Sequence, residues 1–255
     1  MLVEVQSVSK SYAAAGKGRI ETLEGVDLQV HEREFVCLLG PSGCGKSTLL
    51  KLIAGIEQPS AGSIRFGGSP VRTPSPARGV IFQDYALFPW LTVRDNIRFG
   101  LRMQGGSRQQ QRAMTEEALE RFDLQGAGEL YPNQISGGMR QRAAIARALC
   151  LKPALLLMDE PFAALDALLR LRLQEELVRI WQRESSTFVC VTHDVEEALI
   201  LADRIVILTP RPGSIKTIVP VELPRPRDRA SGAFVQLRER VLACLQEERA
   251  EAWQA

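Results

Sequence analysis

One segment in the first fifth of the chain combines glycines, a lysine and hydroxyl side chains at a spacing suited to holding phosphate. The segment consists of Gly40, Pro41, Ser42, Gly43, Cys44, Gly45, Lys46, Ser47 and Thr48. Glycines let successive backbone N–H groups face a phosphate, because a Cβ atom would hinder the approach. Lys46 supplies a positive charge for the outer phosphates of a nucleotide, and Ser47 supplies a hydroxyl ligand for Mg²⁺. The spacing G-x-x-x-x-G-K-[ST] therefore predicts a bound nucleoside triphosphate with Mg²⁺.

A strand and a helix must hold this loop in place. Residues 34–39 form an apolar run that predicts a buried strand, and residues 48–55 predict a helix that ends at a glycine. The helix would add its free N–H groups and the positive end of its dipole to the phosphate site. A surface turn with a solvated lysine is the alternative, and the presence of both flanking elements argues against it.

Four further residues with acid–base or metal-binding side chains stand at the ends of strand-like runs. They are Gln83, Asp159, Glu160 and His193. The runs cover residues 79–82, 155–160 and 187–192. In an open α/β sheet, ligand-binding residues collect at the carboxyl ends of the strands. We therefore expect these four side chains to share one edge of the sheet with the phosphate loop.

Each of the four residues has a chemical role and a plainer alternative. Asp159 is placed to hold Mg²⁺ with Ser47, and Glu160 to polarise the water that attacks the γ-phosphate. Gln83 can reach the metal ion or that water, and His193 can bind the γ-phosphate or orient the water. The alternatives are acids that cap a helix, a loop hydrogen bond for Gln83, and a histidine beside a helix N-cap. The preceding phosphate loop favours catalytic roles for the two acids.

Strand patterns disappear between residues 92 and 150, and helical patterns replace them. The predicted helices cover residues 92–103, 107–122 and 141–149. Ser136, Gly137 and Gly138 precede the third helix. A serine and glycines at the start of a helix can bind a second anion, although an ordinary N-cap serine is the alternative.

The N-terminal and C-terminal segments are simpler. Residues 2–8 and 26–30 predict strands with a turn at residues 13–19, and Tyr12 should stand just past the first strand. Tyr12 could stack on an adenine ring or be a half-buried turn aromatic. Residues 204–208 predict the last strand, and a proline- and arginine-rich segment leads from residue 220 into a helix. Its apolar stripe predicts packing against the domain, and consists of Phe234, Leu237, Val241, Cys244 and Leu245.

Composition narrows the functional classes. The chain has 255 residues and a formal net charge of +2, which predicts no strong attraction to nucleic acid. No apolar run approaches the ~18 residues that span a bilayer, so a membrane role would depend on partner subunits. The five cysteines include no C-x-x-C pair, which favours reduced thiols in the cytoplasm over a disulfide framework.

Taken in order, these motifs resemble the nucleotide-binding subunits of ABC transporters, and the resemblance covers almost the whole chain. It assigns Tyr12 to adenine stacking, residues 40–48 to Walker A and Gln83 to the Q-loop. It assigns Ser136, Gly137 and Gly138 to the signature, and residues 155–159 to Walker B, followed by Glu160 as catalytic residue. Residues 165–166 match the D-loop and His193 the switch histidine. The signature has Met139 where glutamine is usual, and the D-loop has Ala163 where serine is common.

The resemblance implies a definite architecture. The expected fold is α/β, a P-loop NTPase (RecA-like) core with an N-terminal antiparallel β subdomain and an inserted α-helical subdomain. A single ATPase domain would cover residues 1–225, with the core at 1–84 and 151–225 and the helical subdomain at 85–150. Residues 226–255 would form a helical tail without a separate regulatory domain.

The resemblance also implies partners and a mechanism. Two copies would form a homodimer that holds two ATP molecules with Mg²⁺ between them, each touching Walker A of one chain and Ser136 and Gly138 of the other. ATP binding would close the dimer, and hydrolysis with product release would reopen it. Two transmembrane permease subunits would hold it at the cytoplasmic face of the inner membrane, with an extracytoplasmic solute-binding protein as an indirect partner and no nucleic acid.

Three local stretches are similar to the nitrate/sulfonate/taurine branch of bacterial importers: residues 85–93, 136–142 and 209–213. This similarity implies import of a small anion. Other importers, for polyamines, sugars or metals, share part of the first stretch, and an exporter is a further alternative. A soluble ABC ATPase acting on nucleic acid is disfavoured by the compact spacing of the motifs and the near-neutral charge.

Two more expectations concern single side chains. Cys44 stands at a helix N-terminus beside Lys46, which predicts a lowered thiol pKa and inactivation by thiol reagents, with protection by bound ATP. Phe88, Pro89, Trp90 and Leu91 follow the Q-loop and are candidates for a groove that receives a short helix of the permease. A local apolar mini-core is the alternative for these four.

Overall fold

The computed structural model describes residues 1–14, 18–163, 165–184 and 186–252. Its central element is a six-stranded sheet with the order β10-β9-β3-β8-β7-β6. The strands are β3 (Phe35–Leu39), β6 (Arg78–Ile81), β7 (Leu155–Asp159), β8 (Thr187–Val191), β9 (Arg204–Leu208) and β10 (Ile215–Pro220). All neighbouring pairs are parallel except β9 and β10, which pair antiparallel. β10 is a correction to the prediction that residues 204–208 form the last strand; the proline at its end is tolerated because β10 is an edge strand.

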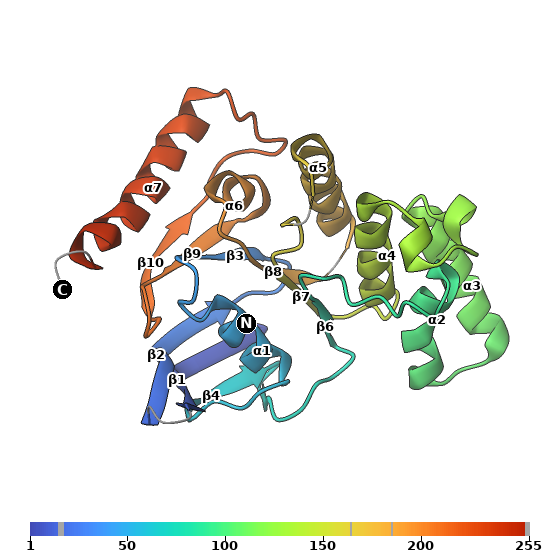
Figure 1. Ribbon diagram of the computed structural model, residues 1–255, viewed down its shortest axis with the longest axis horizontal. Coiled ribbons are helices and arrows are strands. Elements are labelled where there is room, and N and C mark those ends of the chain that lie inside the picture. The colour runs from blue at the N-terminus through green and yellow to red at the C-terminus, as the bar shows by residue number, and fades with distance from the viewer. Residues whose placement is uncertain (15–17, 164, 185, 253–255) are drawn as a thin grey trace.

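A second, antiparallel sheet lies below the central sheet in Figure 1. Its order is β2-β1-β4-β5, with β1 (Val3–Ala14), β2 (Gly18–Val30), β4 (Ala61–Phe66) and β5 (Ser69–Pro70). β1 and β2 extend beyond the strands predicted at residues 2–8 and 26–30, so Tyr12 lies inside β1, opposite Ile20. The predicted turn between them includes residues 15–17, which lie outside the described residues.

Alternating side chains of the central strands divide the core in two. On β3, Val36 and Leu38 belong to the cluster that includes α1 (Lys46–Ala54) and the antiparallel sheet. Phe35, Cys37 and Leu39 belong to the cluster on the opposite face, with the remaining helices. Successive side chains of a strand point to opposite faces, so a parallel strand covered on both sides must be apolar throughout. This explains why β3 and β8 consist of fully buried residues.

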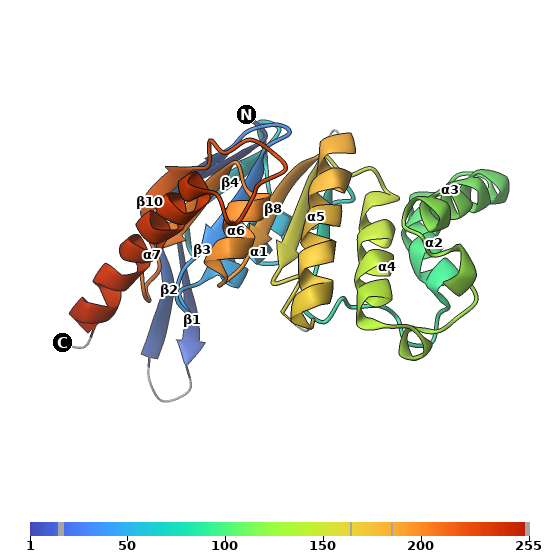
Figure 2. The ribbon, with the colours of Figure 1, turned by 90° about the horizontal axis from the view of Figure 1, so that it is seen from above.

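A helical unit occupies the end of the molecule remote from α7 (Figures 1 and 2). It comprises α2 (Val93–Gln104), α3 (Arg108–Arg121), the 3₁₀ turns η1 (Gln125–Ala127) and η2 (Pro132–Gln134), and α4 (Gly137–Leu149). Side-chain caps define the three starts: Thr92 accepts from the N–H of Asp95, Ser107 forms a capping box with Gln110, and Ser136 accepts from the N–H of Met139. α4 therefore begins four residues before the helix predicted at 141–149.

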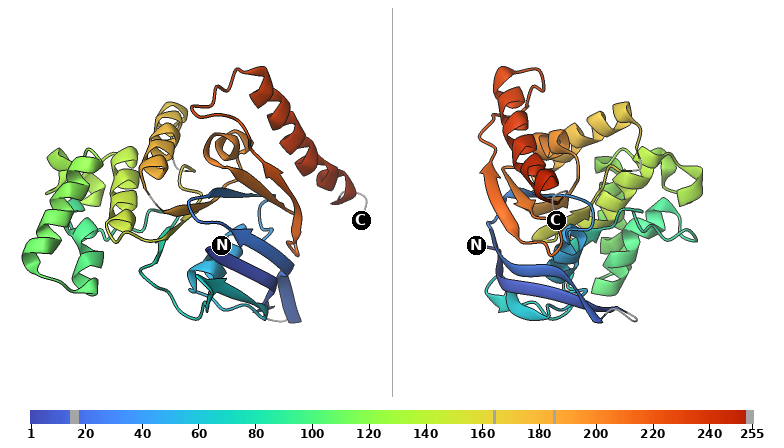
Figure 3. Two further views of the ribbon diagram at one scale, coloured as in Figure 1. Left: turned by 180° about the vertical axis from the view of Figure 1, so that it is seen from behind. Right: turned by 60° about the vertical axis from the view of Figure 1, so that its left-hand side comes forward.

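Three helices cover the same face of the central sheet as α4. They are α5 (Ala167–Arg183), α6 (Val195–Leu201) and α7 (Gly232–Ala252). Figure 3 shows α7 crossing the sheet next to α6 and β10. Phe234 and Val241 are buried and Leu237, Cys244 and Leu245 pack beside them, as the apolar stripe predicts. Within the described residues, no helix has the length and apolar character needed to cross a membrane.

Candidate functional site

The strand register brings the predicted site residues to one edge of the central sheet. Leu38 on β3 and Asp159 on β7 both stand opposite Val191 on β8, and Ile81 on β6 stands opposite Met158. The carboxyl ends of four parallel strands therefore lie level with one another. The residues that follow these ends within a few positions are Gly40, Gln83, Glu160 and His193.

The loop after β3 has a backbone that only glycine adopts easily. Gly43 and Gly45 have φ angles of 80° and 100°. A Cβ atom on Gly45 would also stand 2.5 Å from Cδ2 of Leu23 and 3.0 Å from the carbonyl oxygen of Thr22. Gly45 begins α1 without a side-chain cap, so the first N–H groups of the helix remain available to an anion.

Lys46 is folded back over this loop. Its side chain is only 6% exposed, and Nζ donates to the carbonyl oxygens of Gly40 (2.8 Å) and Pro41 (2.9 Å). The third donor of the ammonium group faces Sγ of Cys44 at 3.8 Å, a weak acceptor that a phosphate oxygen can replace. A charge held in this way costs little reorganisation when an anionic phosphate enters the loop.

Ser47 and Asp159 meet at the start of α1. The Ser47 hydroxyl donates to Oδ1 of Asp159 at 2.8 Å. Burial raises the pKa of Asp159, while the Ser47 hydrogen bond and the nearby lysines Lys51 and Lys46 act in the opposite direction. A hydroxyl and one carboxylate suit Mg²⁺, which takes oxygen ligands and keeps several waters beside substrate phosphates. In the described part of the chain, no group of three or more His, Cys, Asp or Glu side chains could hold a metal ion, so a bound Mg²⁺ depends on such additional oxygens.

Glu160 and His193 approach each other beside this pair. Nδ1 of His193 lies 3.4 Å from Oε2 of Glu160, and the His193 side chain is 62% exposed. Glu160 has φ 46°, a left-handed conformation that is strained for a residue with a Cβ atom, and its N–H donates to the carbonyl of Val191 at 3.0 Å. Strain of this kind, of order 1–3 kcal/mol, persists where the surrounding structure enforces it. The backbone thus aims the carboxylate away from the strand and towards His193.

Gln83 and Tyr12 border the site from two sides. Gln83 is exposed in the turn after β6, on the same sheet edge as Asp159. The hydroxyl of Tyr12 donates to Glu57, and Nζ of Lys10 lies 4.9 Å from its ring centroid. Burial and then Glu57 raise the pKa of Tyr12, and the hydroxyl of Thr48 opposes them, so the phenol lies beside α1.

The Ser136-Gly137-Gly138 segment belongs to a different part of the molecule. Ser136 is exposed at the start of α4, with Oγ 3.3 Å from the N–H of Met139. A Cβ atom on Gly138 would stand 3.0 Å from Cδ1 of Leu169 on α5, so a small residue lets α4 approach α5. Residues of α4 pack in the core on one face of the central sheet, and residues of α1 pack in the core on the other (Figure 1).

Comparison with known proteins decides the family. A model of the ABC transporter family matches residues 23–163. The chain belongs to this family. An ABC transporter ATP-binding protein of Methanocaldococcus jannaschii, itself uncharacterised, is 46% identical over 96% of this chain and 92% of the relative. The chain is therefore an ABC transporter ATPase, and the predicted family, enzyme class and fold are confirmed.

Two transport proteins of Synechococcus elongatus and one solved structure add detail. A bicarbonate transport ATP-binding protein is 48% identical over 90% of this chain, and a nitrate import ATP-binding protein is 46% identical over 98%. The chain spans 35% and 39% of the length of these two relatives. A dimeric ATP-binding cassette solved with ADP and Pi has a TM-score of 0.76 at 30% identity, over 88% of this chain and 100% of that one. The branch predicted from residues 85–93, 136–142 and 209–213 agrees with the nitrate relative.

Arg147 is a site residue of this ABC ATPase that the sequence did not reveal. It stands on α4, eleven positions beyond Ser136, and its guanidinium donates to the carbonyl oxygens of Ala86 (2.6 Å) and Tyr85 (3.0 Å). Tyr85 and Ala86 have positive φ angles, which turns both carbonyls towards the arginine. Arg147 therefore connects the helix that begins at Ser136 to the loop that contains Gln83. The signal available in the sequence was a single arginine among the alanines of residues 143–148.

The branch-typical segment 209–213 also proves to contact the phosphate loop. The N–H of Gly213 donates to the carbonyl of Thr22 at 2.9 Å, and Arg211 donates to the Thr22 hydroxyl at 3.0 Å. A Cβ atom on Gly213 would stand 1.9 Å from the carbonyl oxygen of Cys44. Glycine at this position lets the segment pack directly against Walker A.

The expected lowering of the Cys44 thiol pKa is wrong, and its reactivity towards thiol reagents stays a prediction. Burial raises the pKa of its thiol, and the nearby charge and hydrogen bonds of Lys46 only reduce that effect. Cys44 is 1% exposed, so the side chain points into the core below the loop rather than towards the phosphate side. Desolvation therefore outweighs the helix N-terminus, which acts on the backbone side of the residue.

Proposed function

We propose that this ABC ATPase energises an importer for a small anion, of the nitrate, sulfonate, taurine or bicarbonate class. The support is the identity with the nitrate and bicarbonate relatives over at least 90% of this chain, together with the segment 209–213 packed against Walker A. The observation that carries the ATPase mechanism is the cluster of Lys46, Ser47, Asp159, Glu160 and His193 at one sheet edge.

The proposed chemistry follows from the side chains of the site. The loop N–H groups and Lys46 bind the β- and γ-phosphates of ATP, and the ring of Tyr12 stacks on the adenine. Ser47 and Asp159, with Gln83, hold Mg²⁺, which when bound neutralises charge on the phosphate oxygens. Glu160 accepts a hydrogen bond from the attacking water and orients its lone pair towards phosphorus.

His193 has a supporting role in this proposal. Its Nδ1 faces Glu160, which leaves Nε2 to contact a γ-phosphate oxygen. Donation from Nδ1 to Glu160 and from Nε2 to the phosphate at the same time requires the imidazolium form, in which both ring nitrogens carry a proton. His193 therefore detects the γ-phosphate while Glu160 acts on the water.

We also propose that a second copy of the chain completes each site. Phosphoryl transfer needs donors on all sides of the γ-phosphate, and Walker A approaches from one side only. Ser136 is exposed at the start of α4, on the other face of the sheet from α1, and the first N–H groups of that helix, including that of the buried Gly138, follow it directly. Head-to-tail pairing of two copies would bring these donors to ATP bound by the partner, in keeping with the dimeric ADP-bound relative.

The test is the variant Glu160→Gln. It retains the side-chain shape but loses the basic oxygen, so hydrolysis should fall at least 100-fold while ATP binding persists, in line with the ~10²–10⁴-fold contribution of general bases. With ATP and Mg²⁺ the variant should elute as a dimer in size-exclusion chromatography. Glu32→Gln, which changes an exposed carboxylate in the turn before β3, is the matched control and should keep hydrolysis. Wild-type hydrolysis by Glu160→Gln would refute the assigned role.

Permease docking is the proposed link to the membrane. Trp90 is 71% exposed, and Phe88 contacts both Trp90 (ring centroids 5.5 Å apart) and Phe99 (4.6 Å). This exposed aromatic group favours a docking surface over the alternative of a closed mini-core. Its occupant would be a short apolar helix of a transmembrane subunit, at the cytoplasmic face of the inner membrane, with the solute-binding protein acting from the other side.

Substitution of Trp90 by alanine tests this docking. Because the side chain is mostly exposed, we expect free ATPase activity and stability to change little. Copurification with the permease and coupled transport should fall several-fold. An unchanged assembly would contradict the proposed surface.

A further inference from the structure

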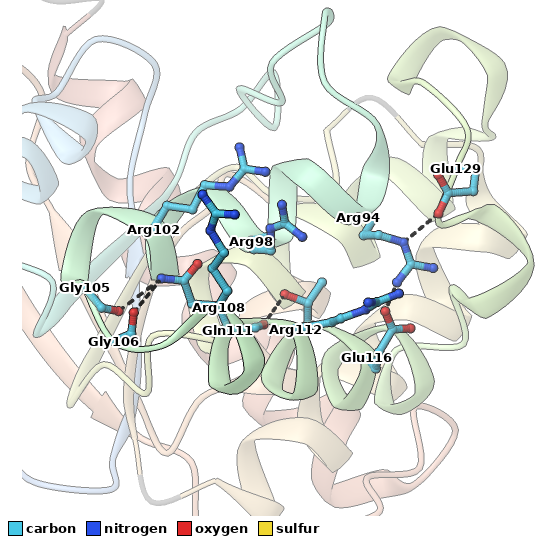
Figure 4. A pocket seen from close by; sticks show the side chains of 11 residues that line it. Arg94, Arg98, Arg102, Gly105, Gly106, Arg108, Gln111, Arg112, Glu116 and Glu129 are labelled. Carbon is cyan, nitrogen blue, oxygen red and sulfur yellow. Dashed lines mark hydrogen bonds and ion pairs between the residues drawn. The ribbon is translucent and has the colours of Figure 1, made fainter.

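An arginine-lined cavity lies between α2 and α3 (Figure 4). These two helices stand at the end of the molecule remote from α1 (Figure 1). Its volume is about 1070 Å³, which is ample for a small organic ligand. Five arginines line it: Arg94, Arg98, Arg102, Arg108 and Arg112. The ATP site proposed above uses none of them.

Helix periodicity concentrates these arginines in one place. Arg94, Arg98 and Arg102 are spaced four residues apart on α2, and Arg108 and Arg112 are spaced four apart on α3, so each set forms one stripe. Figure 4 shows the α2 set along one wall, and on the other Arg108 rising towards Arg102 and Arg112 extending towards Arg94. Gly105 and Gly106, both with positive φ, make the turn between the helices without adding side chains. Like charges four residues apart repel each other and destabilise a helix, so nearby opposite charges must offset this repulsion.

Carboxylates offset only part of this charge. Arg94 pairs with Glu116 and, at 2.6 Å, with Glu129. Asp95 accepts from Arg102 at 3.0 Å but lies 3.7 Å from Nη2 of Arg98, beyond hydrogen-bond distance. With five arginines against two glutamates, the lining has a formal charge of +3, whereas the whole chain carries +2.

Three guanidinium groups remain with unused donors. Nε of Arg98 is buried and has no hydrogen-bond partner among the described residues. Arg108 and Arg112 are exposed, and within the same part of the chain neither forms an ion pair or side-chain hydrogen bond. A buried donor without a partner costs about 1–3 kcal/mol, which a bound acceptor would recover.

We propose that this cavity binds a soluble or lipid-borne molecule that carries two or more phosphate groups. Guanidinium groups match phosphate oxygens in a fixed two-point geometry, and a concave positive surface raises the local anion concentration. The α-carbons of Arg94 and Arg102 stand about 12 Å apart, at 1.5 Å per helical residue, so one compact ion cannot reach both ends. The lining contains no aliphatic or aromatic side chain, which selects against an apolar ligand.

A ligand here would act on two elements that the proposed function uses, the loop at residues 88–92 and α4. Asn96, on the same helix as the arginines, donates to the carbonyls of Phe88 (3.1 Å), Leu91 (3.0 Å) and Thr92 (3.0 Å) and accepts from the N–H of Phe88 (2.8 Å). α2 also packs on α4, which begins at Ser136. Bridging α2 and α3 would therefore restrain both the proposed docking loop and the signature helix.

The test separates this site from Walker A. In a Lys46→Ala background without Mg²⁺, inorganic tripolyphosphate is titrated by calorimetry. The double variant R108Q/R112Q should bind at least ten-fold more weakly than the background. R172Q/R179Q removes the same charge from exposed positions on α5 and should bind within three-fold of it. Melting temperatures of all variants establish that each one is folded.

Vesicles distinguish the two sources of phosphate. Cosedimentation is measured with phosphatidylcholine alone and with phosphatidic acid added. Tripolyphosphate binding without vesicle binding assigns a soluble ligand, and arginine-dependent binding to the acidic vesicles assigns a lipid headgroup; both support the phosphate site. If R108Q/R112Q and R172Q/R179Q behave alike in both assays, or nothing binds, the proposal is overturned.

Discussion

Glu197 offers a quantitative test of how burial controls a carboxylate beside the catalytic edge. It lies in the first turn of α6, only 4% exposed, and lines a cavity of about 40 Å³ with Glu160 and His193. Burial raises its pKa to about 7, and Asp194 adds to the shift. Hydrogen bonds from Thr192 and Gln174 and the charge of Arg170 oppose it. The perturbation is the substitution Glu197→Gln. In the wild type, Nε2 of Gln174 donates to Oε2 of Glu197 at 3.2 Å, and the glutamine keeps an oxygen that can accept this hydrogen bond.

The magnitude follows from the pKa difference between the folded and unfolded chain. In the unfolded chain the carboxyl titrates near 4.5, and in the folded protein near 7. Each unit corresponds to about 1.36 kcal/mol, so the full effect is ~3 kcal/mol. Because the folded state holds the proton more tightly, this stabilisation is complete below pH 4.5, declines as pH rises, and is lost above about pH 7. Glutamine does not titrate, so the Glu197→Gln variant does not lose this stabilisation as pH rises.

Urea unfolding of the nucleotide-free proteins, followed by tryptophan fluorescence, measures this effect. Between pH 5.5 and 8.5 the free energy of unfolding of Glu197→Gln, relative to wild type, should rise by about 2 kcal/mol. The rise accumulates over the roughly 1.5 pH units between pH 5.5 and the folded pKa of about 7, at about 1.36 kcal/mol per unit. Glu196→Gln, a half-buried carboxylate of the same turn that pairs with Arg229 and Arg238, is the matched control and should show a much smaller rise. A rise equal to that of the control would mean that folded Glu197 is ionised throughout, and the reasoning from burial would fail.

Two further predictions concern the phosphate loop. Lys46→Ala should weaken ATP binding in an equilibrium titration at least ten-fold, because it removes the buried ammonium. Lys51→Ala, further along α1, is the control and should bind ATP nearly as the wild type does. Equal affinity in both variants would contradict the role of Lys46. Cys44 should react with a maleimide more slowly than the partly exposed Cys244, since burial raises the pKa of the Cys44 thiol. Mass spectrometry of the labelled peptides measures both rates. Faster labelling of Cys44 would support the expectation from sequence that this thiol is reactive.

Local chemistry explains which features were predictable. Walker A, Glu160 and His193 follow apolar runs, and a parallel sheet aligns the ends of such runs whatever the connections between them. The starts of α2 and α3 were also readable, because Thr92 and Ser107 satisfy free N–H groups within their own first turns. β10 was missed because its pairing partner, β9, is separated from it by the proline- and glycine-containing segment 209–213.

The sequence by itself determined the identity of the phosphate-binding groups, since glycine, lysine and serine at fixed spacing act through backbone geometry and charge that belong to the segment itself. Only the tertiary structure decided the environment of those groups. It buried the Cys44 thiol and reversed its expected pKa shift, directed Arg147 to the loop of Gln83, and set the arginines of α2 against those of α3. Burial and long-range contact depend on what the fold brings together, and residue spacing carries no information about either.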